Sequence, residues 1–319
     1  MTISQTVPRD GVAVHRRRRI RISTVVWFTL PAAAIMLLVL GVPLVYSFYY
    51  SLTGWSLVIP GSDQDFIGLL NYTDILRSSE FWASIRVTLI YAVVAVSLEC
   101  ALGILFAVLL NLEFFGRGLF RSLMLIPMVI TPAVVGIFWK LLYEQDSGVF
   151  NYLFGTLGFE PVPWLSLTVA LASVIIMDVW QSTPFFTLII LAGLQSLDRD
   201  TVSAAQADGA NALQVFRYLT LPHLVPYIMI AAAFRIIGVM ADFDKIFLLT
   251  LGGPGNVTTT LSVYAYNTGF KGLDIGRTTA ISWIYVVFRS RDQRAADLAP
   301  IPRRKRQPPL GEVRDGHFF

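Results

Sequence analysis

The chain has 319 residues, of which 55% are hydrophobic and only 14% are charged. A soluble domain has about a quarter of its residues charged, so this composition excludes a soluble protein and indicates a membrane protein. The net charge of +4 is uneven: residues 1–21 hold six arginines and one aspartate, and residues 289–319 hold eight Lys or Arg and four acids. Basic residues in terminal arms that flank apolar runs favour membrane topology over nucleic-acid binding.

Motifs for catalysis and for metal binding are missing from the sequence. The single cysteine, Cys100, cannot form an internal disulfide, and the three histidines have no acidic or Cys partners at metal-ligand spacing. No GxxxxGK[ST], GxGxxG or GxSxG motif occurs. We therefore expect no catalytic residue, no metal, no cofactor and no ATP hydrolysis by this chain itself.

Long apolar segments follow one another along the chain. A helix needs about 20 mostly apolar residues to cross the hydrocarbon core of a membrane. The segments of that length are 25–50, 85–111, 120–143, 166–194 and 224–250. A sixth begins near Leu273 or Thr278 and stops at Phe288, so that its 16 residues from Leu273 span only about 24 Å. We predict an all-α polytopic membrane protein with six transmembrane helices, the sixth truncated.

The first apolar segment follows a run of basic residues, as a signal peptide does. It is about twice as long as the apolar core of a signal, no clear A-x-A site ends it, and further spans follow, so we expect an uncleaved anchor. The alternating loops 51–83, 144–164 and 252–276 hold only two Lys or Arg, whereas the other connections and both ends hold 18. Basic residues accumulate on the cytoplasmic side, which predicts that both termini are cytoplasmic.

The predicted cytoplasmic segment 198–225 carries the sharpest pattern in the sequence. Asp200 can cap a helix whose first turn is Thr201–Ala204, and its alanines form a small-residue face that another protein can approach closely. Gly209 interrupts this helix, and an apolar helical stretch follows until Pro222 resets the chain. We predict a helix–turn–helix that lies at the membrane surface.

This segment resembles the EAA loop of ABC-importer permeases. The family pattern is E-A-A, three further residues, Gly, and about nine residues later an apolar residue followed by x-Leu-Pro. The residues that fill or adjoin these places are Ser203, Ala204, Ala205, Asp208, Gly209, Leu221 and Pro222. The resemblance implies that the Ser203–Leu221 loop couples the chain to partner ATPases. Ser203 stands where the family usually has Glu, which removes one carboxylate that could pair with a basic group on the ATPase.

Further motifs along the chain look like the carbohydrate-type permeases of the maltose-importer class. They include Leu30-Pro31, Asn71-Tyr72, Thr183-Pro184-Phe185, Phe234-Arg235-Ile236-Ile237 and Gly252-Gly253-Pro254. The resemblance implies a multi-pass subunit of a bacterial or archaeal plasma membrane. Its implied partners are a second homologous permease, two cytoplasmic ABC ATPases that bind the ATP, and an extracytoplasmic solute-binding protein.

Polar residues inside the apolar segments are functional candidates, because a charge at the middle of a membrane helix costs about 2.5–3.5 kcal/mol. Positions i, i+3, i+4 and i+7 of the fourth segment share one face, and a second stripe lies on the fifth segment. These substrate-pathway candidates are Asp178, Gln181, Ser182 and Phe185, then Arg235, Val239 and Asp242. The resemblance implies that a sugar binds between these two helices.

An alternative reading keeps these charges structural. Asp178, Arg235 and Asp242 can instead neutralise one another or pair with the second permease. We expect the adjacent opposite charges Asp244 and Lys245 to be structural and to face the subunit interface. Glu99 has no evident partner in the sequence.

The composition changes abruptly after Phe288. Residues 289–319 contain four prolines and the basic run 303–306, which predicts a disordered basic tail after the transmembrane domain at 25–288 and the basic arm at 1–24. A reading-frame change or truncation is our hypothesis for this switch. The expected function is the permease subunit of an ATP-driven importer of a sugar or sugar-like solute. The alternatives are a glycerol-phosphate or polyol permease, and a truncated non-transporting paralogue or membrane scaffold.

Overall fold

The computed structural model describes residues 24–297, with side chains from Trp27 to Val287 except Arg199. Within this part every regular element is helical, and the only extended pairings are two isolated bridges between loop residues. The all-α prediction is therefore confirmed. The predicted arm up to residue 23 and the tail residues 298–319 lie outside the described residues.

The helices follow one another in a simple order. The α-helices are α1 (Thr24–Met36), α2 (Val42–Ser51), α3 (Leu70–Arg77), α4 (Ser79–Asn111), α5 (Arg117–Val129), α6 (Pro132–Leu142), α7 (Val149–Thr156), α8 (Ala170–Gln195), α9 (Arg199–Ala207), α10 (Ala212–Val215), α11 (Leu221–Ala241), α12 (Asp244–Thr250), α13 (Leu261–Tyr266) and α14 (Ile275–Asp297). Single π-helical turns lie at Leu37–Gly41, Phe216–Thr220 and Asn267–Lys271, and a 3₁₀ turn lies at Ser62–Gln64.

The chain divides into two compact units, with the boundary after Tyr49. In the first unit, α1, the π-turn and the beginning of α2 form an apolar helix in which no described side chain is buried. Its exposed side chains include Trp27, Phe28 and Leu37. A helix that is apolar on all sides needs lipid or another protein around it.

Four helical segments of the described chain are long and apolar enough to cross a membrane, or five if one bent pair is a single span. They are Trp27–Ser51, Ser79–Asn111, Ala170–Gln195 and Ala212–Ala241, and the bent pair is α5 with α6. Multiple apolar helices of this kind are typical of a multi-pass membrane protein. Helix α14 does not meet the same criterion, which agrees with the short sixth apolar segment of the sequence.

The predicted third span, 120–143, is not one straight helix. Its two halves, α5 and α6, meet at an angle of 100°. Ile130 and Thr131 between them are extended, and Pro132 begins α6. The bend has a local cause, because a proline disfavours helical geometry in the residue before it and has no N–H to continue a helical hydrogen-bond ladder.

The predicted fifth span, 224–250, is also interrupted. Helix α11 ends at Ala241, Asp242 takes an extended conformation as its C-cap, and α12 begins at Asp244. Charged residues at this break have partners on neighbouring helices: Lys245 pairs with Asp178 of α8, and Asp242 accepts a hydrogen bond from Tyr91 of α4. The break therefore belongs to the polar site described below.

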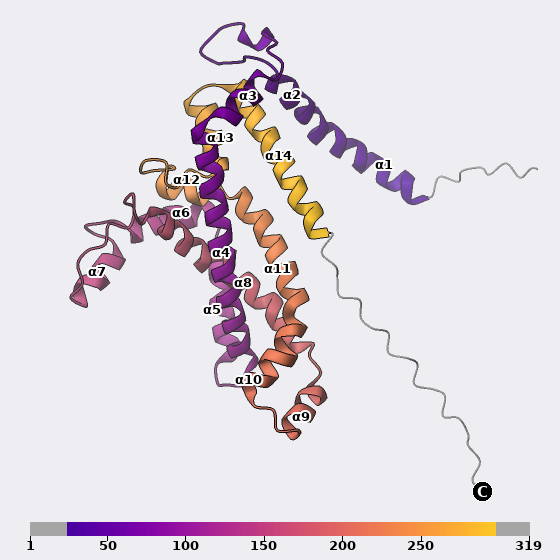
Figure 1. Cartoon of the computed structure of the whole chain (residues 1–319), viewed down its shortest axis with the longest axis vertical. Helices are drawn as coiled ribbons and strands as arrows, with labels where there is room; N and C mark the ends of the chain where they lie inside the picture. Colours follow the sequence, from indigo (N-terminus) through magenta and orange to yellow (C-terminus); the bar gives the residue numbers. More distant parts are fainter. Residues whose placement is uncertain (1–23, 298–319) are drawn as a thin grey trace, which may run out of the picture. The chain divides into compact units, whose positions relative to one another are not determined.

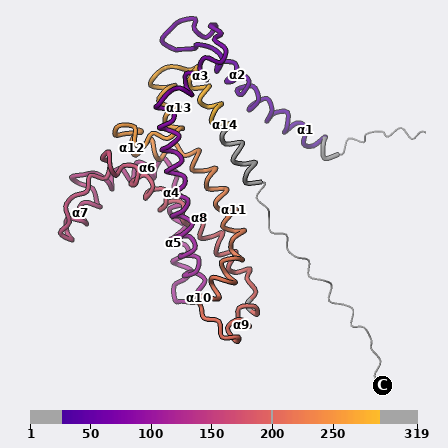
Figure 2. Tube along the Cα trace, viewed as in Figure 1, coloured from indigo at the N-terminus to yellow at the C-terminus, as the bar shows by residue number. Residues whose placement is uncertain are grey.

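Helix α8 is the central element of the second unit. It packs along α4 and against α11, and Figures 1 and 2 show these three long helices side by side. In the membrane-length window of α8, 72% of the residues are buried, against 33% for α4. Gly103 of α4 permits this close packing, because a Cβ there would lie only 2.5 Å from the Cβ of Phe186. The central position of α8 explains why its polar side chains face protein and not lipid.

Helix α14 continues beyond the end of the sixth apolar segment. Its backbone remains helical to Asp297, past the point where the sequence turns polar at Arg289. The stretch 289–297 has Arg, Gln and Ala, which are good helix formers, and the first proline comes only at Pro300. The helix therefore continues although the apolar segment ends at Phe288.

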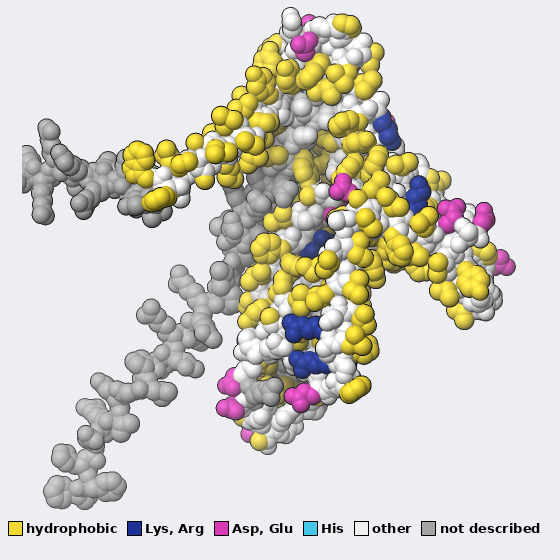
Figure 3. All heavy atoms as spheres, turned by 180° about the vertical axis from the view of Figure 1, so that it is seen from behind, with side chains coloured by type: hydrophobic (Ala, Val, Ile, Leu, Met, Phe, Trp, Pro, Cys, Tyr) yellow, Lys and Arg dark blue, Asp and Glu magenta, His cyan; other side chains and the backbone are white. Residues whose placement is uncertain are grey.

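The surface of the second unit is apolar along its long helices, and acidic side chains lie mainly away from their middle. In Figure 3 hydrophobic side chains cover much of the long helices, whereas acidic side chains gather where α9 and α10 lie and around α7. The exposed acids near α9 are Asp198, Asp200 and Asp208, and those near α7 are Glu144, Asp146 and Glu160. This distribution is typical of a protein whose middle faces lipid or partner helices and whose ends face water.

Candidate functional site

Asp178 is the centre of a buried ion-pair network. Its side chain is fully buried in the middle of α8. Arg235 Nη2 of α11 lies 3.0 Å from its Oδ2, and Lys245 Nζ of α12 lies 2.5 Å from its Oδ1. Ser182, one turn later on α8, donates its hydroxyl to Oδ1 at 3.2 Å. The fourth and fifth apolar segments are thus joined by charge pairs at mid-helix.

Glu99 of α4 completes the pairing of Arg235. The Nε and Nη2 atoms of Arg235 each lie 2.7 Å from one oxygen of the Glu99 carboxylate, which is the two-pronged geometry that makes such bonds strong. The sequence alone indicates no partner for Glu99. The sequence does contain an isolated acid in one span and an isolated base in another, which could pair. No spacing rule, however, connects residues so far apart in the sequence.

Lys245 links the network across the break between α11 and α12. Its Nζ lies 2.9 Å from Asp242 Oδ2, and Tyr91 of α4 donates its hydroxyl to the same oxygen at 3.0 Å. Asp244 is exposed, whereas Lys245 is buried and pairs with Asp178 and Asp242. The expectation that Asp244 and Lys245 form a structural pair at a subunit interface is therefore wrong for Lys245, because the helix restart at Asp244 turns its side chain into the core.

A cavity of about 230 Å³ lies beside this network. Its lining residues are Met128, Pro132, Gln181, Ser182, Phe185, Arg235, Asp242 and Lys245. Five of the seven predicted pathway residues therefore share one cavity. Asp178 and Val239 are buried and are not among its lining residues. Met128, Pro132 and Lys245 were not predicted, because the bend between α5 and α6 brings the first two to the cavity.

Two residues that line this cavity each have a polar atom with no partner among the described residues. Arg235 Nη1 and Asp242 Oδ1 take part in none of the hydrogen bonds or ion pairs that occupy the other ends of these groups. The network holds three carboxylates and two cations, so it carries a formal charge of −1. Arg235 can thus still donate and Asp242 can still accept hydrogen bonds, in a network of slight negative charge.

The predicted helix–turn–helix is present, with a different cap. Asp198, not Asp200, is the N-cap of α9, and its carboxylate accepts a hydrogen bond from the Asp200 N–H at 3.0 Å. Gly209 ends this helix at a φ of +85°, where a side chain would be strained although no atom lies within 4 Å. Asn211 then starts α10 with a capping box in which its side chain and that of Gln214 each accept from the other's backbone.

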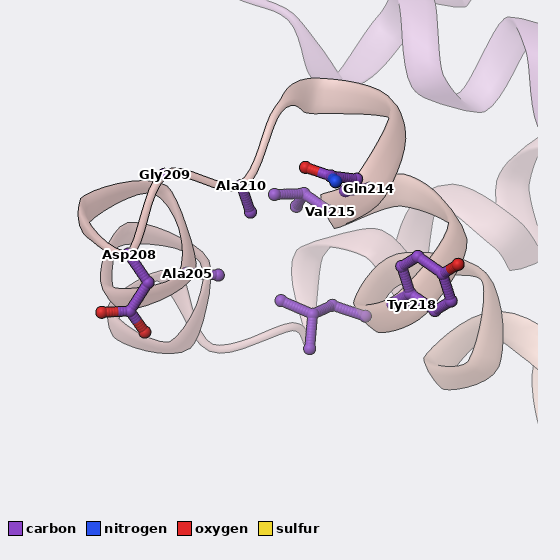
Figure 4. A pocket seen from close by; sticks show the side chains of 8 residues that line it. Ala205, Asp208, Gly209, Ala210, Gln214, Val215 and Tyr218 are labelled. Carbon is purple, nitrogen blue, oxygen red and sulfur yellow. The ribbon is translucent and has the colours of Figure 1, made fainter.

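A groove of about 460 Å³ lies between the end of α9 and the following turn. Figure 4 shows Ala205 and Ala210 on one side of it, Tyr218 on the other, and Val215 between them. Of the predicted coupling residues, Ala205, Asp208 and Gly209 line this groove. The remaining members of that set lie outside it: Ser203 and Ala204 are exposed on α9, and Leu221 and Pro222 begin α11.

Comparison with known proteins agrees with this architecture. Residues 99–289 match the family described as binding-protein-dependent transport system inner membrane component. The chain belongs to this family of membrane transport components, which are not enzymes. It is an ABC-importer permease of the sugar-transport family.

Individual relatives support the same assignment. The chain is 96% identical to the probable ABC transporter permease protein y4oQ of Sinorhizobium fredii, over 90% of this chain and 93% of that protein. It is 40% identical to the trehalose/maltose transport system permease protein MalF of Thermococcus litoralis, over 79% and 85% of the two chains. It is similar in fold to a bacterial alginate ABC transporter in complex with its alginate pentasaccharide-bound periplasmic protein, with a TM-score of 0.73, 22% identity, and coverage of 85% and 92%.

Proposed function

We propose that this permease moves a neutral, hydroxyl-rich solute such as a disaccharide into the cytoplasm. The observation that carries the proposal is the cavity where α8, α11 and α12 meet, lined by Arg235 and Asp242, each of which has a polar atom without a partner among the described residues. A guanidinium donor and a carboxylate acceptor can bind neighbouring hydroxyl groups with charge-assisted hydrogen bonds. The Phe185 ring at the same wall can pack on the apolar face of a sugar ring.

The charge of the network favours a neutral solute over a phosphate ester. Both cations are already paired with carboxylates, and the excess charge is negative. A phosphate would meet Asp242 beside Arg235, and like charges in a site of low dielectric repel strongly. Two relatives named for trehalose transport, one of them also for maltose, support the same choice.

The partners follow from the same assignment. We propose that a second homologous permease and lipid cover the exposed apolar helices, and that two cytoplasmic ATPases bind the ATP and dock at the groove beside Gly209. An extracytoplasmic binding protein delivers the solute, and both termini lie on the cytoplasmic side of a bacterial or archaeal plasma membrane. This chain contributes no cofactor.

The coupling role is tested by filling the groove. Gly209→Trp places a large side chain at the groove and strains the backbone, so we expect ATP hydrolysis to continue while solute uptake falls at least tenfold. The measurement is solute transported per ATP hydrolysed by the complete complex in proteoliposomes. Unchanged uptake by this variant would contradict the proposal, and binding of the ATPases without uptake by the unaltered chain would favour the non-transporting scaffold.

A further inference from the structure

A cluster of hydrogen bonds joins α8 to α11 at the base of the coupling loop. Ser196 is the C-cap of α8, and its Oγ lies 3.0 Å from His223 Nε2 and 2.8 Å from the Tyr227 hydroxyl. The carbonyl of Gly193 accepts from Ser196 Oγ at 2.8 Å and lies 3.2 Å from His223 Nε2. His223 and Tyr227 belong to the first two turns of α11. The cluster therefore joins the end of α8, where the loop begins, to the start of α11, where the loop ends.

The donors and acceptors of this cluster can all be matched. A carbonyl oxygen only accepts, so the His223 tautomer that bonds Gly193 carries its proton on Nε2, and it shares this proton between the Gly193 carbonyl and Ser196 Oγ. The Tyr227 hydroxyl can then donate to Ser196, whose own proton goes to Gly193. Such a connected set holds its members more firmly than separate bonds would.

Close packing fixes the same contact. A Cβ on Gly193 would lie 2.8 Å from the ring of Tyr227 and 3.0 Å from Leu224 Cδ2, both of which are held on α11. Only glycine therefore allows α11 to approach α8 so closely here. The rings of His223 and Tyr227 also pack together, with centroids 5.8 Å apart.

No comparable side-chain hydrogen bond links the described residues within the loop to the long helices. The described side-chain hydrogen bonds between residues 197 and 220 join residues at most three positions apart, as in the Asn211–Gln214 capping box. Among the described residues, side-chain hydrogen bonds therefore tie the loop to the long helices at its two ends. At mid-height the same two helices are joined again, by Arg235 and Asp178 at 3.0 Å beside the cavity.

We infer that Ser196, His223 and Tyr227, seated on Gly193, form a clasp that makes α8 and α11 move together when the loop is displaced. They are positioning residues that transmit the movement of the loop to the cavity. The inference rests on the proposed function, in which the loop couples ATP hydrolysis to solute movement.

The test uses Ser196→Ala and Tyr227→Phe in the complete complex, with its ATPases, second permease and binding protein. We expect the solute transported per ATP hydrolysed to fall about fivefold in each variant, while the amount of assembled complex is unchanged. The double variant should be no worse than the more affected single variant, because both remove the same hydrogen bond. Tyr227→Phe keeps the ring that packs on Gly193, so it preserves folding.

Ser122→Ala is the matched control. Its hydroxyl donates only to Gly118 of its own helix, at 3.0 Å, so transport per ATP should not change. If Gly209→Trp lowers this ratio but Ser196→Ala and Tyr227→Phe do not, the clasp is wrong and the proposed function stands. If less complex assembles but the solute transported per ATP is unchanged, the cluster is only a structural contact, and the inference is overturned. If Gly209→Trp leaves the ratio intact, the proposed function itself fails.

Discussion

Glu99 shows how single residues acquire their roles from helices that are distant in sequence. Its carboxylate is completely buried on α4 and, among the described residues, pairs with Arg235 on α11. A buried ion pair adds little net stability, because desolvation offsets the attraction, but removal of one partner leaves an uncompensated charge. The network is therefore sensitive to the loss of any one member.

Glu99→Ala should destabilise the protein markedly. Arg235 would keep only its contact with Asp178, and loss of one partner of a buried pair costs about 3–5 kcal/mol. Glu80→Ala on the exposed first turn of the same helix is the control and should cost about 1 kcal/mol or less. Thermal unfolding in detergent measures both. Equal losses in the two variants would show that the pair with Arg235 is not formed.

Asp242→Asn should weaken solute binding in addition to weakening the ion pair with Lys245. The substitution keeps the shape of the side chain but removes the charge of a carboxylate that lines the cavity. A hydrogen bond to a charged group contributes about 1.5–3 kcal/mol, so the KM for uptake should rise at least tenfold. The concentration dependence of uptake measures this change. A KM equal to that of the unaltered protein would remove Asp242 from the solute site.

Among the helices, α6 and α12 illustrate a contact that depends on one small residue. Gly136 of α6 faces the backbone of α12, where an added Cβ would lie 2.6 Å from the carbonyl oxygen of Lys245 and 2.9 Å from its Cα. Backbone cannot move aside as a flexible side chain can. The position of Lys245 beside Asp178 therefore depends on glycine at this point.

Gly136→Ala should separate the two helices and disturb the network. Overpacking of this kind costs about 1–3 kcal/mol, and we expect uptake to fall in parallel as Lys245 shifts. Gly118→Ala is the control, since a Cβ there meets no atom within 4 Å and helix propensity favours alanine. Unfolding temperature and uptake should both stay near normal in the control, and normal values in Gly136→Ala would contradict the close contact.

The sequence predicted where the long helices lie better than where these helices bend or break. Apolar length located the long helices, and helical spacing placed Gln181, Ser182 and Phe185 on one wall of the cavity. The bend before Pro132 and the break at Asp242 were missed, because both residues lie within runs that remain apolar on average. Pairing between distant helices, as for Glu99, depends on tertiary packing that no local pattern encodes.

The whole molecule combines an apolar exterior with a small polar interior. Hydrophobic side chains cover the long helices, and the buried charges gather around one cavity on α8, α11 and α12. A groove at one end, with a hydrogen-bonded clasp at the base of its loop, connects to the helices that carry these charges. This arrangement suits a permease whose cavity is opened and closed by partners at the end of the molecule.

Uptake into proteoliposomes tests this account as a whole. The chain is reconstituted with its second permease, its ATPases and its binding protein, and accumulation of labelled trehalose or maltose is followed against ATP hydrolysis. We predict ATP-dependent accumulation that neutral disaccharides compete for and that phosphate esters such as glycerol phosphate do not. Competition by phosphate esters but not by neutral sugars, or ATP hydrolysis without accumulation of any of these solutes, would contradict it.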